Sequence, residues 1–133
     1  MAGLLTHLIA SFVGFAIIYI FFKSWKYSLA FVLGHLMPDI ISFGITGIRQ
    51  GSSNPGIIMT NSWFAPLAAF AHNPFTWIIL VTIVWVGALL LYSFKKMSKK
   101  AFLDTILVII LFVIGTTMHL IFDKLIIETS YWV

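Results

Sequence analysis

The sequence predicts an all-α, polytopic membrane protein with four transmembrane helices, and two observations lead to this fold class. Of the 133 residues, 61% are hydrophobic and only 9% are charged, and a soluble domain of this length could not hide so much apolar surface from water. Four apolar stretches also reach the roughly 20 residues that a helix needs to cross a bilayer. We therefore expect residues 1–133 to form a single transmembrane helical domain in the cell membrane.

The four expected spans follow from where the apolar stretches begin and end. The first, 4–22, is too long for a signal-peptide core, and its basic residues follow it rather than precede it, so we interpret it as a retained span. The second, 27–48, is interrupted by Pro38, which removes an internal hydrogen bond and bends the helix. The third span is 75–94 and the fourth is 101–127.

The connection 49–73 between the second and third spans is the longest of the three. Its first part, 50–56, is rich in Gly, Ser, Asn and Pro and is expected to turn. In its second part, 61–71, Asn61 or Ser62 can cap a helix start, and Trp63 suits the headgroup boundary. We expect a short interfacial helix there.

Lysines give the orientation. They gather in the first and third connections, at positions Lys23, Lys26, Lys95, Lys96, Lys99 and Lys100. The positive-inside rule places both connections in the cytoplasm, so both termini and the connection 49–73 should lie outside. This placement accounts for the net charge of +4 as membrane orientation, and we expect membrane lipids rather than nucleic acid as partners.

Ionisable residues within or beside the spans are the candidate functional residues: His7, His35, Asp39, His72, His119 and Asp123. A charged side chain near the middle of a bilayer costs at least about 2.5–3.5 kcal/mol on insertion scales. Only four acidic residues occur in the chain, and Asp39 and Asp123 are two of them. Each lies four residues after a histidine, which places the two side chains on one helix face.

Depth brings most of these residues into a common outer layer although they are far apart in sequence. Counted from the cytoplasmic lysines at about 1.5 Å per helical residue, His7, Asp39 and His119 lie roughly 20–28 Å up. His72 and Asp123 both reach roughly 34 Å, and we expect His72 at the edge of the group. His35 is the lowest, at roughly 14 Å, and its role stays open.

Structural alternatives remain for these residues. His7 can snorkel to the surface from its helix end, His72 can cap the third span, and His119 can donate to a neighbouring carbonyl. Asp123 can pair with Lys124 at the rim. Asp39 is hardest to explain in this way, because no basic residue lies in its own span.

The residue types define the expected chemistry. The chain has no cysteine, which excludes disulfides, thiolate metal sites and cysteine nucleophiles. Imidazole and carboxylate are the usual ligands of zinc, iron and manganese in the absence of thiolate. We therefore predict a divalent-metal site, with zinc first and iron or manganese as alternatives. Its expected ligands are His7, Asp39, His72, His119 and Asp123. Asp39 or Asp123, whichever does not bind the metal, is the candidate catalytic base.

Several short stretches resemble small membrane-bound metal-dependent hydrolases of the YdjM-like type. They are the amino terminus through Thr6-His7, Gly34-His35-Leu36-Met37-Pro38-Asp39-Ile40, His72-Asn73-Pro74-Phe75-Thr76 and Met118-His119-Leu120-Ile121-Phe122-Asp123, and they occur in the order of that family. The resemblance implies a hydrolytic metal site formed by the five ligands named above. This chain departs from the family pattern after Asp39, where Ile40, Ile41 and Ser42 replace an Asp and a His, and at Trp77, which replaces a His. A reduced ligand set is therefore implied.

Three functions follow as hypotheses. The first is a metal-dependent hydrolase acting on a lipid or lipid-linked phosphate at the outer leaflet. The second is a small accessory or structural subunit of a larger membrane complex, which would have other membrane subunits as partners. The third is a haem or quinone anchor subunit, since His7 and His119 lie at similar depths and can supply two axial ligands. Metal content, co-purifying subunits or a Soret band would separate the three.

Overall fold

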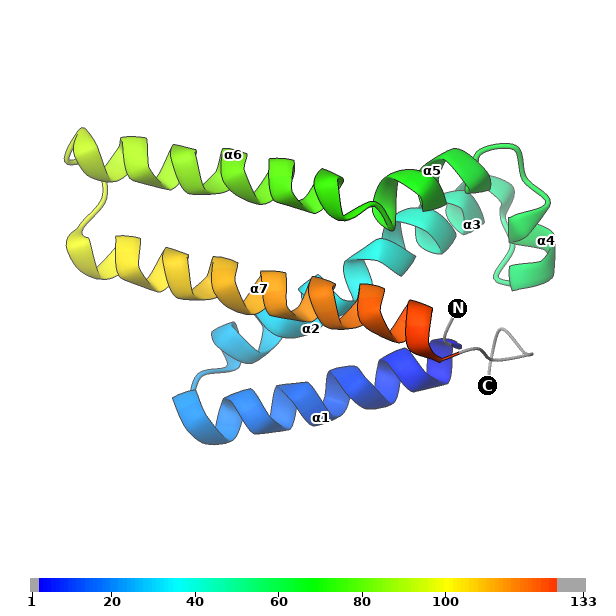
Figure 1. The fold of residues 1–133 in the computed structure, drawn as a ribbon, viewed down its shortest axis with the longest axis horizontal. Coiled ribbons are helices and arrows are strands. Elements are labelled where there is room, and N and C mark those ends of the chain that lie inside the picture. The colour runs from blue at the N-terminus through cyan, green and yellow to red at the C-terminus, as the bar shows by residue number, and fades with distance from the viewer. Residues whose placement is uncertain (1–2, 127–133) are drawn as a thin grey trace.

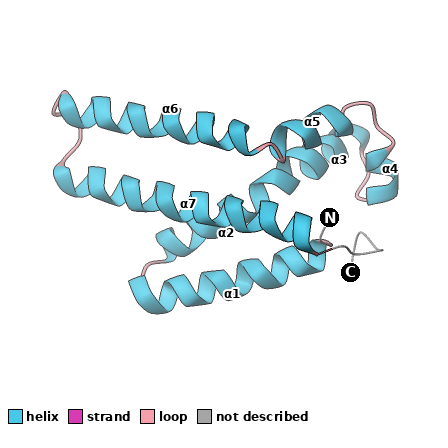
Figure 2. Cartoon of the chain, viewed as in Figure 1, coloured by secondary structure: helices cyan, strands magenta, loops and turns pink. Residues whose placement is uncertain are grey.

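The computed structural model describes residues 3–126, and every regular element in this range is helical (Figures 1 and 2). Within the described range, four helical stretches are long and apolar enough to cross a membrane. They are α1 (Leu4–Phe22), the continuous run from α2 (Trp25–Asp39) through η1 (Ile40–Gly44) to α3 (Ile45–Gln50), α6 (Pro74–Ser93) and α7 (Lys99–Leu125). The predicted all-α polytopic fold is confirmed.

The predicted spans agree closely with these helices. The first has the predicted bounds, and the third begins and ends one residue earlier than predicted. The fourth begins at Lys99, because Ser98 caps it by accepting a hydrogen bond from the backbone N–H of Ala101. Its predicted last residue, Ile127, lies outside the described residues.

The second span passes Pro38 without ending. Pro38 has no N–H to donate to the carbonyl of Gly34, and the hydroxyl of Thr116 in α7 donates to that carbonyl instead, at 3.0 Å. The carbonyl of Pro38 accepts from Ser42 at 2.9 Å. The five residues of η1 form a π-helix directly after Asp39, a feature that is frequent at functional sites.

Helices α2 and α7 form the closest helix pair of the fold. Gly34 lies against the backbone of Phe112, and Gly115 lies against the carbonyl of Phe31 and the amide nitrogen of His35. A Cβ at either glycine would overlap these backbone atoms. Small residues permit such approach within membranes, where apolar burial does not drive helix association. The contact places His35 and Asp39 beside His119 and Asp123.

Gly115→Ala is expected to destabilise the protein by about 1–3 kcal/mol, because the added methyl group must push α2 away from α7. The measurement is the free energy of unfolding in mixed micelles. Gly87→Ala in α6 is the matched control, since nothing lies within 4 Å of a Cβ built at Gly87. Equal stability of the two variants would contradict the close packing.

The connection between the second and third spans contains two short helices, where one was predicted. The expected interfacial helix is α5 (Phe64–Ala71), which begins later than predicted because the Asn61 side chain forms a turn with the N–H of Trp63. The additional helix is α4 (Pro55–Met59), which Asn54 caps by accepting from the N–H of Gly56. The expected turn over 50–56 is thus shorter, because Gln50 ends α3 and Pro55 begins α4.

The two lysine-bearing connections lie at one end of the bundle, and α3, α4 and α5 gather at the other end (Figure 1). Helix α2 packs against both α1 and α7, and α6 packs against α7. At the lysine end, Asp104 of α7 accepts hydrogen bonds from Lys26 at 2.8 Å and from the hydroxyl of Tyr27 at 2.6 Å. These contacts join α2 to α7 at that end of the bundle.

Candidate metal centre

The six candidate residues lie together at the end of the bundle that carries α3, α4 and α5. Helix α1 contributes His7, α2 contributes His35 and Asp39, the turn after α5 contributes His72, and α7 contributes His119 and Asp123. The rings of His7, His35 and His119 are almost completely buried, whereas the side chains of Asp39 and His72 are 17% and 18% exposed. The group is therefore closed on one side and reachable from the surface on the other.

Two imidazole nitrogens and a carboxylate form the tightest part of the group. The Nε2 atoms of His72 and His119 lie 3.3 Å apart. The Oδ2 atom of Asp123 is 3.1 Å from the first nitrogen and 3.4 Å from the second. Four ligands at about 2.0–2.2 Å from a tetrahedral zinc ion lie about 3.3–3.6 Å apart. These three atoms therefore have the separations of ligands to one metal ion.

Asp39 occupies the fourth corner of the arrangement. Its Oδ1 atom lies 3.7 Å from the Nε2 of His72 and 3.7 Å from the Nε2 of His119. These distances are longer than those made by Asp123, and the side chain of Asp39 is more exposed, at 17% against 9%. Asp39 therefore stands on the accessible side of the group.

Backbone carbonyls determine which ring nitrogen carries the proton in two histidines. The Nδ1 of His72 lies 3.0 Å from the carbonyl oxygen of Ala68, and the Nδ1 of His35 lies 3.2 Å from that of Gly115. A carbonyl oxygen only accepts hydrogen bonds, so Nδ1 is the donor in both rings. When either ring is neutral, its lone pair is therefore on Nε2. Such carbonyl anchoring of the remote N–H is the usual support of a metal-binding histidine.

His7 also donates a hydrogen bond from its Nδ1, as His35 and His72 do. The Nδ1 of His7 lies 3.2 Å from the accepting Nε2 of His35 and donates to it. The Nε2 of His7 lies 3.3 Å from Oδ1 of Asp123. A cation bound at this place would attract both the imidazole nitrogen and the carboxylate. Asp123 thus faces histidines with both of its carboxylate oxygens.

The ring of His119 is held by packing. Its Nδ1 is buried and has no hydrogen-bond partner among the described residues. The ring stacks on that of His7, with centroids 4.1 Å apart and an interplanar angle of 23°. His7 therefore both contacts Asp123 and orients His119.

The electrostatics of the accessible side also favour a cation. Burial lowers the pKa of His72, but the hydrogen bonds to Asp123 and Asp39 outweigh this effect and raise the pKa to about 9. A metal ion would take the place of the proton that the two carboxylates favour, because a ligating histidine must be neutral.

The structure thus brings together all five residues of the predicted ligand set. Two sets of three residues have ligand atoms within 4.8 Å of one another and can hold a metal ion: Asp39, His72 and His119, and His7, His35 and His119. The alternative interpretation of Asp123 was an ion pair with Lys124 at the rim. The carboxylate of Asp123 instead contacts His7, His72 and His119.

His35 is the residue that sequence reasoning left without a role. The helical rise placed it roughly 10 Å below His7, yet their ring nitrogens are in hydrogen-bond contact. Helices α1 and α2 cross at an angle (Figure 1), so equal rise along the two helices does not mean equal depth. Its spacing of four residues from Asp39 was the available signal, because both residues then lie on one face of the helix.

The departures from the family pattern have structural roles of their own. The indole N–H of Trp77 donates to the carbonyl of Ala71 at 2.6 Å, and its ring packs on Phe112 of α7. Ser42 is buried and binds the carbonyl of Pro38, whereas Ile40 is exposed. The histidine–carboxylate group is therefore formed without ligands from these positions.

No protein-family model, curated protein or solved structure matches this chain.

Proposed function

We propose that the protein is a membrane-embedded metal-dependent hydrolase of a lipid phosphate or lipid-linked phosphate. One observation carries the proposal: the Nε2 atoms of His7, His72 and His119 converge on the carboxylates of Asp39 and Asp123 at 3.1–3.7 Å in a largely buried place. Imidazole nitrogens and carboxylate oxygens are the ligands that zinc, iron and manganese take when no thiolate is present, and a bound dication would neutralise the two buried carboxylates.

The ligand set supports a particular division of roles. The short separations among His72, His119 and Asp123 suit three ligands of one metal ion, and three protein ligands with one open position are typical of catalytic zinc sites. Nitrogen and carboxylate ligands fit zinc first, with iron or manganese as alternatives. A bound divalent ion supplies a Lewis acid for a phosphoryl oxygen and activates water near neutral pH.

Asp39 is the proposed general base. It lies on the accessible side, within 3.7 Å of two of the ligand nitrogens, and a carboxylate there can take a proton from an attacking water. In the reaction, the oxygen of water forms a new bond to phosphorus, and the bond between phosphorus and the lipid oxygen breaks. The lipid alcohol leaves with a proton, and phosphate is the second product.

The place of the group in the bundle supports a membrane substrate. It lies at the end of the bundle opposite the two lysine-bearing connections (Figure 1). The positive-inside rule assigns the connections to the cytoplasm and therefore this end to the outer leaflet. A lipid headgroup can reach that depth without leaving the membrane.

The haem-anchor alternative fits the geometry less well. Axial ligands direct their nitrogens at one iron from opposite faces of a porphyrin. The rings of His7 and His119 instead stack face to face at 4.1 Å. The accessory-subunit alternative remains open to the experiment that follows.

Elemental analysis of the detergent-purified protein tests the proposal. We expect about one equivalent of zinc, iron or manganese per chain, and phosphate release from a long-chain lipid phosphate that stops on chelation and returns with the metal. Bound metal without any hydrolysis, together with co-purifying membrane subunits, would favour the accessory role. A protein that binds no divalent metal would end the proposal.

A further inference from the structure

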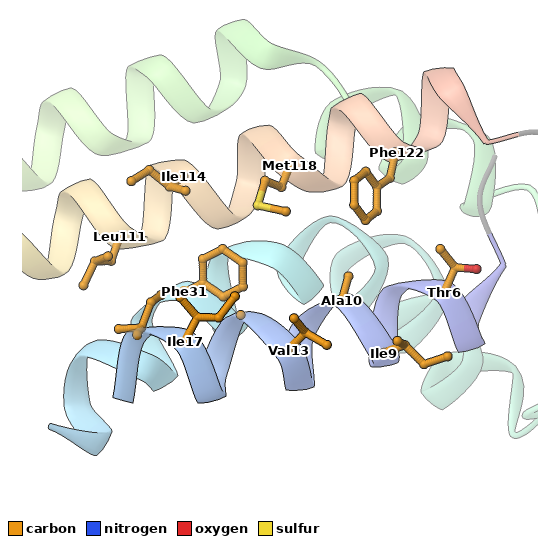
Figure 3. A pocket seen from close by; sticks show the side chains of 12 residues that line it. Thr6, Ile9, Ala10, Val13, Ile17, Phe31, Leu111, Ile114, Met118 and Phe122 are labelled. Carbon is orange, nitrogen blue, oxygen red and sulfur yellow. The ribbon is translucent and has the colours of Figure 1, made fainter. Parts of the chain in front are cut away.

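An apolar groove of about 540 Å³ runs along the outer surface between α1 and α7 (Figure 3). Phe31 of α2 lies between the two helices, and Gly14 of α1 makes room for its ring, since a Cβ there would overlap it. Val13 on one wall and Ile114 on the other are 49% and 44% exposed. The groove is therefore open sideways, toward the hydrocarbon of the membrane.

One end of this groove adjoins the candidate metal centre. Thr6, Met118 and Phe122 line it, and each of them directly precedes a member of the centre in sequence, namely His7, His119 and Asp123. The ring of Phe122 also contacts that of His35, with centroids 5.9 Å apart. The groove thus ends beside the metal centre, although none of the six members of the centre lines it.

The dimensions of the groove match one hydrocarbon chain of a leaflet. Its lining extends from Thr6 to Ile18 on α1 and from Leu111 to Phe122 on α7, which is about 18 Å along the first helix and about 17 Å along the second. Half of a typical bilayer core is about 15 Å thick. Thr6, at the end nearest the centre, is the lining residue with a hydroxyl group, and the remaining lining is apolar. A lipid whose head lies at the centre would therefore place its chain along this groove.

We infer that the groove holds one hydrocarbon chain of the lipid substrate while the phosphate of that lipid lies at the metal centre. This inference rests on the proposed function and adds the substrate class to it: a phosphate monoester of a lipid with at least one chain long enough to reach the bilayer midplane. The protein then selects its substrate by two parts of the lipid, because the centre binds the phosphate and the groove binds the hydrocarbon chain.

Photo-crosslinking tests the inference. The probe is the phosphonate analogue of phosphatidic acid, whose carbon–phosphorus bond is not hydrolysed, with a diazirine in the middle of one acyl chain, in phosphatidylcholine vesicles that contain the zinc-loaded protein. We expect mass spectrometry to find the label on residues 9–17 and 111–118, about tenfold above the exposed face of α6, which corresponds to about 1.4 kcal/mol of preference. Val13→Trp should fill the groove and remove this excess.

Val84→Trp in α6 is the matched control. Val84 is 56% exposed, and it lies nine residues before Ser93, as Val13 lies nine residues before Phe22. This variant should leave labelling of the groove unchanged. Ile114→Trp, on the opposite wall, repeats the test should Val13→Trp fail to fold, and unchanged metal content shows that each variant is intact.

The headgroup requirement separates this inference from the proposed function. Diacylglycerol with the same diazirine, or the phosphonate probe after chelation of the metal, should label the groove about tenfold less than the phosphonate probe with zinc. Equal labelling under all conditions, in protein that binds a full equivalent of zinc, would overturn the inference and leave the proposed function in place. Wild-type protein that binds no metal would overturn both.

Discussion

Asp123→Asn is expected to lower the zinc content of the purified protein at least about 10-fold, the largest loss of metal from a single conservative change. Asp123 contacts three histidines, with the Nε2 atoms of His7, His72 and His119 at 3.1–3.4 Å. The amide keeps the shape of the side chain, but it removes the negative charge and turns an N–H₂ group toward the ligand nitrogens. Elemental analysis after equilibration with zinc and gel filtration gives the measurement.

Asp104→Asn is the control for this prediction. It makes the same substitution in the same helix, at a position that contacts Lys26 and Tyr27 at the lysine end. Zinc content should stay at the wild-type level, since exposed ion pairs of this kind contribute little to stability. Similar zinc content in Asp123→Asn and Asp104→Asn would show that Asp123 does not bind the metal.

Asp39→Asn is expected to keep most of the metal but to reduce phosphate release by about 10²–10⁴-fold. The reason is the position of Asp39 on the accessible side, where its contacts of 3.7 Å are longer than those between the three proposed ligands. Single-turnover hydrolysis and metal content are measured on the same preparation. A loss of metal as large as that in Asp123→Asn would instead make Asp39 a ligand and leave the general base unassigned.

Hydropathy predicted most of the fold, because the bilayer limits the chain to a few long apolar helices. Chain length between the lysines and the ionisable residues also predicted that His7, His119 and Asp123 share a layer. The sequence did not predict α4, because Asn54-Pro55 is compatible with both a turn and a helix start. The approach of His35 to His7 depends on how α1 and α2 cross, which no spacing within one helix describes.

Other parts of the centre depend on contacts between helices, and a single sequence contains no direct signal for them. The bond from Thr116 to the carbonyl of Gly34 requires the close approach of α2 and α7. The proton positions on His35 and His72 depend on the carbonyls that happen to face them, those of Gly115 and Ala68. Residue type therefore predicted the kind of ligand, whereas the fold determines which atom of each ligand is free.

The hydrogen-bond chain from His7 through His35 ends at the carbonyl of Gly115, which cannot take up a proton and pass it on. From this group toward the lysine end, residues 27–34 of α2 and residues 105–118 of α7 contain no acidic or basic side chain. A proton released at the centre thus has no relay toward the lysine end and must return to the side from which water enters. The proposed hydrolysis would therefore add no path for protons from one side of the membrane to the other.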